Sequence, residues 1–392
     1  MKRKLYTFTI LFLLSINWLY AISFGFHAFE IRTNPEFSKG VLPTSLVYQF
    51  DFPVPDFIEG NASEINFRID NGIDFRTLRQ DPETGRPFSD YLEIDRPDYP
   101  KDYITIYDEM NLIFGQGFFR TPYSNNDLLK LWVTFDIRFE NAYERLSYLY
   151  DSDNREALFI TEGYPNGTER FSSWIGQPEL AGNRSTTNFS FSLGFDFDMM
   201  QDDITRRKGV KNSFRVRLNP AWTDWMNSDS NDFLFFWDKL DLAFTPVAIN
   251  MQGDRDTTWF SMVIDNSTVY RYITGEKVPY YLQGGQIFGT SALNTEHVVT
   301  NRTSLTFYGP QINSYDCYPY ISAFVDLGFS FGTILNSVDR SDYFESVASV
   351  GIRAEFVIFN IASFYYEIGY VIDNVLNEQQ VPVLQFGFSF GV

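Results

Sequence analysis

The sequence predicts an all-β chain that forms a transmembrane antiparallel β-barrel of about 12–16 strands. Three observations lead to this fold class: segments that alternate apolar with polar residues, a very high aromatic content, and a secretion signal at the start of the chain. Successive side chains of a strand point to opposite faces, so alternation makes one face apolar and the other polar. A membrane barrel turns the apolar face to lipid and the polar face to its lumen.

Residues 1–21 have the pattern of a cleaved signal peptide. A basic segment at 2–4 precedes a mostly apolar stretch at 5–14, and Ala21 is the expected last residue before cleavage. The alternative is an uncleaved anchor helix, but the apolar stretch is short for a span of roughly 20 residues. We therefore expect an exported protein whose mature chain is 22–392, residing in a bacterial outer membrane.

The composition narrows the class of protein. The formal net charge is −19, and loss of the three basic residues of the signal peptide takes the mature chain to −19 − 3 = −22. Such an acidic chain lacks the basic face that nucleic-acid binding needs. Its single cysteine, Cys317, cannot form an intramolecular disulfide or a cysteine zinc site. No long apolar run follows the signal peptide, so we expect no membrane-spanning helix.

Strand-length alternation recurs along the mature chain. It also explains why 41 Phe and 24 Tyr coexist with a mean hydropathy of −0.21, since half of each strand is polar. Trp132 and Phe324 are exceptions that fall on the polar parity. A soluble sandwich would bury the apolar rows, but so many strands would need a very large core. Alternation is strong at 65–70, 131–140, 189–199, 214–219, 321–332 and 350–356, and weaker at 45–52, 102–118, 240–245, 260–273, 304–308 and 364–370.

One strand of this set provides a test of the two faces. Leu193 and Ser192 are neighbours on opposite parities of 189–199. We expect Leu193→Arg to place a charge against lipid, and Ser192→Arg to point into the lumen and fold nearly normally.

The two ends of the mature chain are expected to meet. Leu384 to Val392 alternates apolar with small or polar residues, and the segment 23–28 does the same near the start. Pairing of the first and last strands removes the open sheet edges that lipid cannot tolerate. We expect Gly25 to lie opposite Ser389. The last strand is also the segment through which the chain would meet the outer-membrane barrel assembly machinery.

Polar connections separate the strands. The segments 79–101 and 145–184 are rich in proline, glycine and charged residues and are predicted to be long external loops. No composition shift marks a domain boundary, so 22–392 is interpreted as one barrel. Aromatic girdles are expected where a barrel meets the two membrane interfaces, and the candidates are Trp222, Trp225, Trp237, Trp259, Tyr318 and Tyr320.

Motifs for chemistry are weak. The segments 328–332 and 387–391 match G-x-S-x-G, but each serine lies inside an alternating strand with no helix after it. The two histidines, His27 and His297, have no acidic partner that the sequence can place beside them. Acid clusters near 151–154 and 196–203 lack calcium-loop spacing. We expect no enzymatic activity, no catalytic residue, no metal site and no cofactor.

The last 75 or so residues resemble the end of the bacterial outer-membrane surface-antigen barrels. That family includes the assembly-factor and two-partner-secretion transporters, and the signal peptide also resembles those of spirochaete barrels. The resemblance implies an outer-membrane barrel and, as one functional alternative, a secretion or assembly role. The chain ends on Val392 where the family usually ends on an aromatic residue. The segments that carry the resemblance are 320–328, 349–353, 366–370 and 386–390.

The expected function is a porin-like pore for small polar solutes. Opposite charges on the lumen face would tune its selectivity, and acidic loops would favour cations. The alternatives are a non-conducting barrel with ligand- or host-binding surface loops, and the secretion or assembly barrel. The candidate lumen-lining residues are Arg68, Asp70, Asp136, Arg138, Glu140, Asp196, Asp198, Arg215, Arg217, Arg353 and Glu355.

Overall fold

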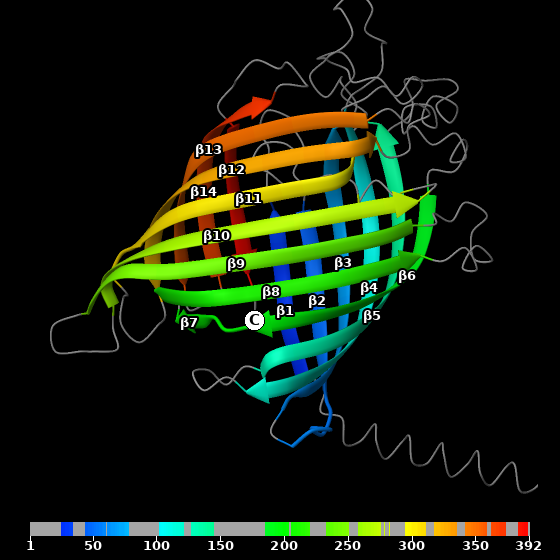
Figure 1. Ribbon diagram of the computed structural model, residues 1–392, viewed down its shortest axis with the longest axis horizontal. Helices are drawn as coiled ribbons and strands as arrows, with labels where there is room; N and C mark the ends of the chain where they lie inside the picture. The colour runs from blue at the N-terminus through cyan, green and yellow to red at the C-terminus, as the bar shows by residue number, and fades with distance from the viewer. Residues whose placement is uncertain are drawn as a thin grey trace, which may run out of the picture.

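The computed structural model consists of strands that belong to one antiparallel sheet (Figure 1). Among its described residues, no helix is long and apolar enough to cross a membrane. The structure describes residues 25–33, 44–59, 61–77, 102–120, 127–144, 185–203, 205–219, 233–250, 258–275, 278, 282, 295–310, 317–334, 342–358, 362–373 and 383–390.

Fifteen strands are present in the described part of the chain. They are β1 (Gly25–Thr33), β2 (Thr44–Pro53), β3 (Ser63–Thr77), β4 (Asp102–Arg120), β5 (Asp127–Glu144), β6 (Ser185–Asp198), β7 (Gln201–Asp203), β8 (Arg206–Asn219), β9 (Phe233–Asn250), β10 (Thr258–Gly275), β11 (Thr295–Tyr308), β12 (Tyr318–Ile334), β13 (Asp342–Ile358), β14 (Ala362–Asp373) and β15 (Val383–Phe390).

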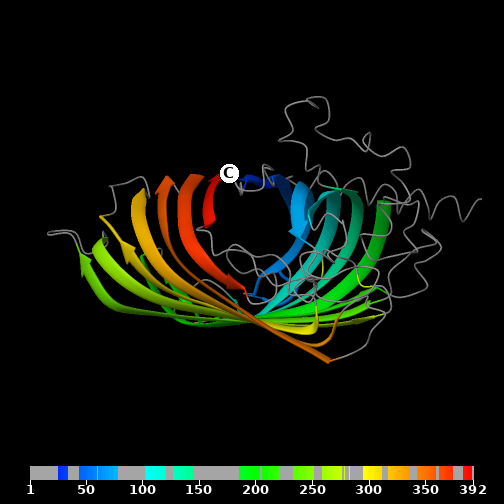
Figure 2. The same ribbon diagram turned by 90° about the horizontal axis from the view of Figure 1, so that it is seen from above.

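Pairing runs from strand to strand around a barrel wall. Each strand pairs with the next one in the chain, except that β6 pairs with β8 and not with β7, and β1 pairs with β15. The short β7 follows β6 and pairs with the start of β8, so it is not counted as a separate strand of the barrel wall. Of the fifteen described strands, fourteen therefore form the wall, which curves around an interior in Figure 2. This number lies within the predicted range.

Antiparallel order divides the connections between two ends of the barrel. The predicted long loops at 79–101 and 145–184 leave from the same end, because they follow β3 and β5. Their own structure lies outside the described residues, as does that of the signal peptide. The start of β1 and the end of β15 lie at the opposite end. In outer-membrane barrels the longer loops are extracellular and the shorter turns periplasmic.

The two faces of the wall differ sharply in chemistry. On β6, Ser192 is fully buried, whereas its neighbour Leu193 is 56 % exposed. The same inversion holds around the wall, where exposed residues are large and apolar and buried ones are often polar or charged. A soluble sandwich would show the reverse. The exterior is therefore an apolar, lipid-facing surface and the chain is a transmembrane barrel. Outward examples include Phe135, Phe244, Ile264, Ile321, Ile352, Phe364 and Tyr370.

The seam between β1 and β15 differs from the predicted one. The register places Thr33 opposite Phe388, so the expected pairing of Gly25 with Ser389 is wrong. Extended along both strands, this register would set Ile31 opposite Phe390, because 33 + 388 = 31 + 390. The first six residues of β1, 25–30, thus extend beyond the described β15, although they pair with β2 on their other edge. Neighbouring strands in a barrel are staggered, and the stagger at this closure cannot be read from the sequence.

Candidate functional site: two polar clusters on the inner wall

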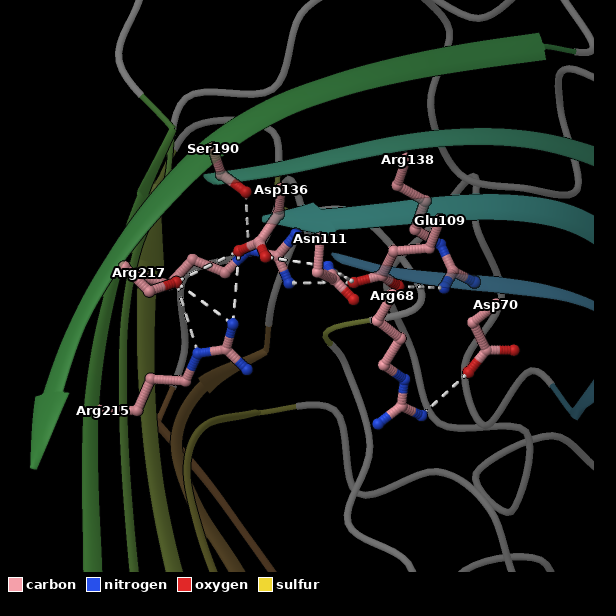
Figure 3. Close-up of polar contacts among 10 residues, drawn as sticks. Arg68, Asp70, Glu109, Asn111, Asp136, Arg138, Ser190, Arg215 and Arg217 are labelled. Carbon is pink, nitrogen blue, oxygen red and sulfur yellow. Dashed lines mark hydrogen bonds and ion pairs between the residues drawn. The ribbon is translucent and has the colours of Figure 1, made fainter. Parts of the chain in front are cut away.

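A dense polar cluster covers the inner face of β3, β4, β5, β6 and β8. Figure 3 shows these side chains converging from neighbouring strands. Alternation places them on one face, and the antiparallel register then brings them level. We call this set the Asp136 cluster; its members are Arg68, Asp70, Glu109, Asn111, Asp136, Arg138, Ser190, Ser192, Arg215 and Arg217.

Asp136 is the centre of this cluster and is fully buried. Its Oδ1 accepts a hydrogen bond from Asn111 Nδ2 at 2.8 Å, and its Oδ2 accepts one from Ser192 Oγ at 3.1 Å. Arg215 Nη2 lies 3.2 Å and Arg217 Nε 3.5 Å from the same Oδ2. One carboxylate therefore compensates two guanidinium groups. A buried charge of this kind is tolerated only when it is paired and hydrogen-bonded.

Glu109 extends the cluster towards β3. Its Oε2 accepts a hydrogen bond from Arg138 Nη1 at 2.9 Å. The Arg138 guanidinium also lies 4.0 Å above the ring of Tyr107, whose hydroxyl donates to Asp70 at 3.2 Å. Asp70 in turn lies 3.3 Å from Arg68. The chain of contacts is continuous along the wall from β3 to β8.

A second cluster lies on β11 to β14, and we call it the Asp326 cluster. Arg302 makes a bidentate pair with Asp326, with both N–O distances at 2.7 Å. Its Nη2 also lies 3.3 Å from Glu367, which is 3.6 Å from Arg353 Nη1. Two parallel N–H···O bonds fix the orientation of a guanidinium better than a single contact does. The full set is Arg302, Tyr320, Asp326, Ser349, Arg353, Glu355 and Glu367.

Glu355 closes the other end of the Asp326 cluster. It accepts hydrogen bonds from Arg353 at 2.8 Å and 2.5 Å, and one from the hydroxyl of Tyr320. The Arg353 guanidinium lies 4.0 Å above the ring of Tyr365. Two arginines and three acids make this cluster one unit negative, whereas four arginines and three acids make the Asp136 cluster one unit positive. The two clusters lie almost half the ring apart.

Both clusters contain the same three-layer stack. An inward aromatic ring lies across a glycine on the neighbouring strand, and an arginine lies over the ring. The glycine leaves the space that the ring fills, because a Cβ there would collide with ring atoms. The stack explains why Trp132 and Phe324 break the alternation. The stacks are Arg138–Tyr107–Gly72, Arg215–Trp132–Gly194 and Arg302–Phe324–Gly351.

The remaining predicted lumen residues lie outside these networks. Asp198 is inward and lies 3.0 Å from Lys211 Nζ. Asp196 has the same parity on β6. The backbone of Glu140 pairs with Tyr107 on β4, and its side chain lies outside the described residues. The structure thus brings Arg68, Asp70, Asp136, Arg138, Arg215 and Arg217 together in one cluster, and Arg353 and Glu355 in the other.

Several members of the clusters are not among the residues that the sequence predicts to line the lumen. Glu109 and Asn111 lie on β4, where Asp108 on the outward parity weakens the alternation. Arg302 lies on β11, of which only 304–308 was predicted. Their pairing could not be found from sequence, because each partner lies on another strand.

Two sequence-based expectations need correction. Trp237 packs against a buried apolar cluster, and Tyr318 and Tyr320 are inward, so these three are not girdle residues; Trp259 is exposed, as a girdle residue should be. Trp222 and Trp225 lie outside the described residues. Ser192 is buried between Asp136 and Arg215, so Ser192→Arg would add a third guanidinium to a packed site rather than enter open space.

The candidate chemical motifs separate in space. Ser330 of the first G-x-S-x-G segment is buried and bonds Thr295 at 2.6 Å. His297 lies on the opposite parity of the wall, stacked between Tyr272 and Phe331. Among the described residues, no group of three or more His, Cys, Asp or Glu side chains is placed to hold a metal ion. The side chain of His27 and the segment 151–154 lie outside the part of the chain that the structure describes.

Comparison with known proteins shows similarity of fold only. No protein-family model and no curated protein matches the chain. Among solved structures, it is similar to BamA from Haemophilus ducreyi lacking POTRA domains 1–3, at 11 % identity over 94 % of this chain and 70 % of that one, with a TM-score of 0.47. It is also similar to CdiB from Escherichia coli, at 10 % identity over 93 % of this chain, with a TM-score of 0.48.

CdiB from Acinetobacter baumannii gives a similar result, at 10 % identity over 93 % of this chain and a TM-score of 0.46. The chain spans less than two thirds of the two CdiB chains, 62 % and 60 % of their length.

Proposed function

We propose that this protein is an outer-membrane barrel of the secretion or assembly kind, in which the seam between β1 and β15 receives an incoming strand. The observation that carries the proposal is the stagger of this seam. Residues 25–30 pair with β2 but extend past the described end of β15. The backbone N–H and C=O groups of a strand edge are a ready template for another strand.

The stagger supports this function because of its location. The apolar exterior places the wall in lipid, where an unpaired backbone group costs several kcal/mol. Among the described residues, β15 offers no partner to this edge of 25–30, and a second strand entering from the side would satisfy its backbone groups. The other junctions of the wall differ, since each joins two strands of the wall that follow one another along the chain. In the described wall, the β1–β15 junction is the one place where the first and the last strand of the chain pair.

A disulfide staple tests the seam. Thr33→Cys with Phe388→Cys, in a Cys317→Ser background, joins residues that are directly opposite across the seam. The matched control staple, Ser363→Cys with Ser389→Cys, joins β14 to β15 in established register. Each protein is reconstituted in liposomes and challenged with a urea-unfolded eight-stranded barrel, whose insertion is followed by protease resistance.

The unstapled protein and the control staple should accelerate insertion, and the seam staple should abolish the acceleration until a reductant is added. Full acceleration by the oxidised seam staple, or no acceleration by the unstapled protein, would contradict the proposal.

The second candidate is a pore for small polar solutes. Its support is the inner wall, which carries two charged clusters of opposite net sign. Planar-bilayer conductance of the refolded protein separates the two candidates. A pore should conduct equally with the seam stapled or open, because solute passes along the lumen and not through the seam.

A further inference from the structure

A patch of uncharged polar side chains lies on the lipid-facing side of β10 and β11. Asn266 and Thr268 share the outward parity of Ile264, which is 41 % exposed, and Asn301 and Thr303 share that of Phe307. The register sets Asn266 opposite Thr303 and Thr268 opposite Asn301. We call these four residues the Asn–Thr quartet.

The quartet forms a closed ring of hydrogen bonds. Asn301 Nδ2 donates to Thr268 Oγ1 at 2.8 Å, and Thr268 Oγ1 donates to Asn266 Oδ1 at 3.2 Å. Asn266 Nδ2 donates to Thr303 Oγ1 at 2.8 Å, and Thr303 Oγ1 donates to Asn301 Oδ1 at 3.2 Å. Each amide carries two N–H groups and uses one of them within this ring. Two N–H groups therefore remain to be satisfied by something outside the quartet.

The quartet lies in the middle of the lipid-facing band. His297 is stacked with Tyr272 and Phe331 towards one end of β11, and Phe307 is stacked with Phe260 towards the other. Asn301 is four residues from His297, and Thr303 is four residues from Phe307. The ten residue steps from His297 to Phe307 span about 25 Å along the membrane normal at the usual rise and tilt of barrel strands, which matches an apolar band.

Polar groups at this depth are costly if they face lipid. An unsatisfied N–H in hydrocarbon costs several kcal/mol. Elsewhere at mid-height, the described outward faces of β5, β6, β12 and β14 carry residues such as Phe135, Leu193, Leu327 and Ile368. Nearby, Asn212 on β8 donates to Asp238 on β9 at 2.7 Å, on the same outward side. Lipid is therefore a poor neighbour for these polar positions on the outer face of β8 to β11.

We propose that the outer face of β10 and β11 is an interface for a second copy of this chain. A twofold interface sets the same surface against itself, so it needs groups that both donate and accept. The Asn–Thr quartet supplies both and carries no charge, so two copies do not repel. The residues around it, Leu242, Ile264 and Leu305, are apolar. Asp238 lies on β9, to one side, so an axis through the quartet keeps the two copies of Asp238 apart.

Cysteine crosslinking in membranes tests directly whether a second copy of the chain lies against β10 and β11. Asn301→Cys and Thr303→Cys are made singly in the Cys317→Ser background of the full chain, and membranes are treated with an oxidant or a short bis-maleimide. At least one position should give a dimer on SDS gels. Val350→Cys, which is 45 % exposed on β13, is the matched control and should stay monomeric. No dimer at either quartet position, or crosslinking to a different protein, would overturn the proposal.

A second measurement uses protein purified in lipid nanodiscs or mild detergent. The unaltered chain should have the mass of a dimer by light scattering. Asn266→Leu with Asn301→Leu should be a folded monomer, because the face then suits lipid. The control Ser346→Leu makes the same polar-to-apolar change on the outward parity of β13 and should remain dimeric. A monomeric unaltered chain, or a dimer that survives the double substitution, would refute the interface.

Discussion

The Asp136 and Asp326 clusters have the same components but differ in burial and in charge. In the first, Asp136 is fully buried and Arg217 is only 5 % exposed. In the second, Arg302 is 39 % exposed and its two acids are almost buried. In the first cluster, Arg215 and Arg217 therefore share one buried carboxylate. In the second, a partly exposed arginine is held by a bidentate pair with Asp326.

This difference indicates two roles for charge on one wall. A buried charge that loses its partner is strongly destabilising, so the Asp136 cluster is expected to determine whether β4, β5, β6 and β8 stay in register. A pair whose arginine is partly exposed contributes less to stability and more to the local field. The Asp326 cluster is therefore the part of the wall that a solute in the lumen would sense.

The largest expected effect comes from removing the shared carboxylate. Asp136→Ala leaves Arg215 and Arg217 without their buried partner, and should lower the free energy of unfolding by ~3–5 kcal/mol. Asp326→Ala should cost less, because Arg302 is more exposed and retains Glu367. Urea titration in liposomes, followed by tryptophan fluorescence, measures both. Equal losses would mean that burial does not distinguish the clusters.

Charge placed on the lipid face behind each cluster tests whether the difference is confined to the interior. Leu193→Arg on β6 and Ile352→Arg on β13 should each destabilise the barrel by ~2–4 kcal/mol near mid-bilayer. Both side chains are more than half exposed on the outer face. The same urea titration applies, with Asp196→Asn on the inward face of β6 as a control that should change stability little. A large gap between the two arginine variants would place one strand away from mid-bilayer.

The glycines beneath the aromatic rings offer a matched pair of overpacking tests. Gly194→Ala would press a methyl group against Trp132 and the carbonyl of Phe214, and Gly351→Ala against Phe324 and the carbonyl of Ile368. Because backbone atoms are involved in both, each substitution should cost ~1–3 kcal/mol. Gly72→Ala meets only the Tyr107 ring and should cost less. Thermal shifts of SDS-resistant folded protein would rank the three, and a neutral Gly194→Ala would argue against the stack.

The smallest effect is expected on ion selectivity, if the lumen conducts. Glu367→Gln removes a negative charge from the Asp326 cluster and should weaken a cation preference, whereas Arg215→Gln removes a positive one from the opposite wall and should strengthen it. Reversal potentials at low salt measure this, and the difference should fade at high salt as charges are screened. Shifts of the same sign would mean that the two walls do not act as opposing charges.

The sequence alone determined which way most strands face. Ser192 and Leu193 were assigned to opposite faces because alternation is a local property of a strand, and their burial agrees. Alternation is weak at 260–273, and the predicted segment of β11 begins only at 304, for a physical reason, since the outward faces of β10 and β11 carry the polar Asn–Thr quartet. The quartet consists of two N-x-T segments, whose first and third residues share one face.

Only the tertiary structure decided which side chains meet. Glu109 and Arg138, or Arg302 and Glu367, lie on different strands, and their pairing depends on a register that a shift of one residue would invert. The same holds at the seam. The sequence predicts that the first and last strands pair, but the residue of β1 that lies opposite the end of β15 is Thr33 and not Gly25. Side-chain parity is determined within one strand, whereas stagger is determined by closing the whole wall, and no single segment carries that information.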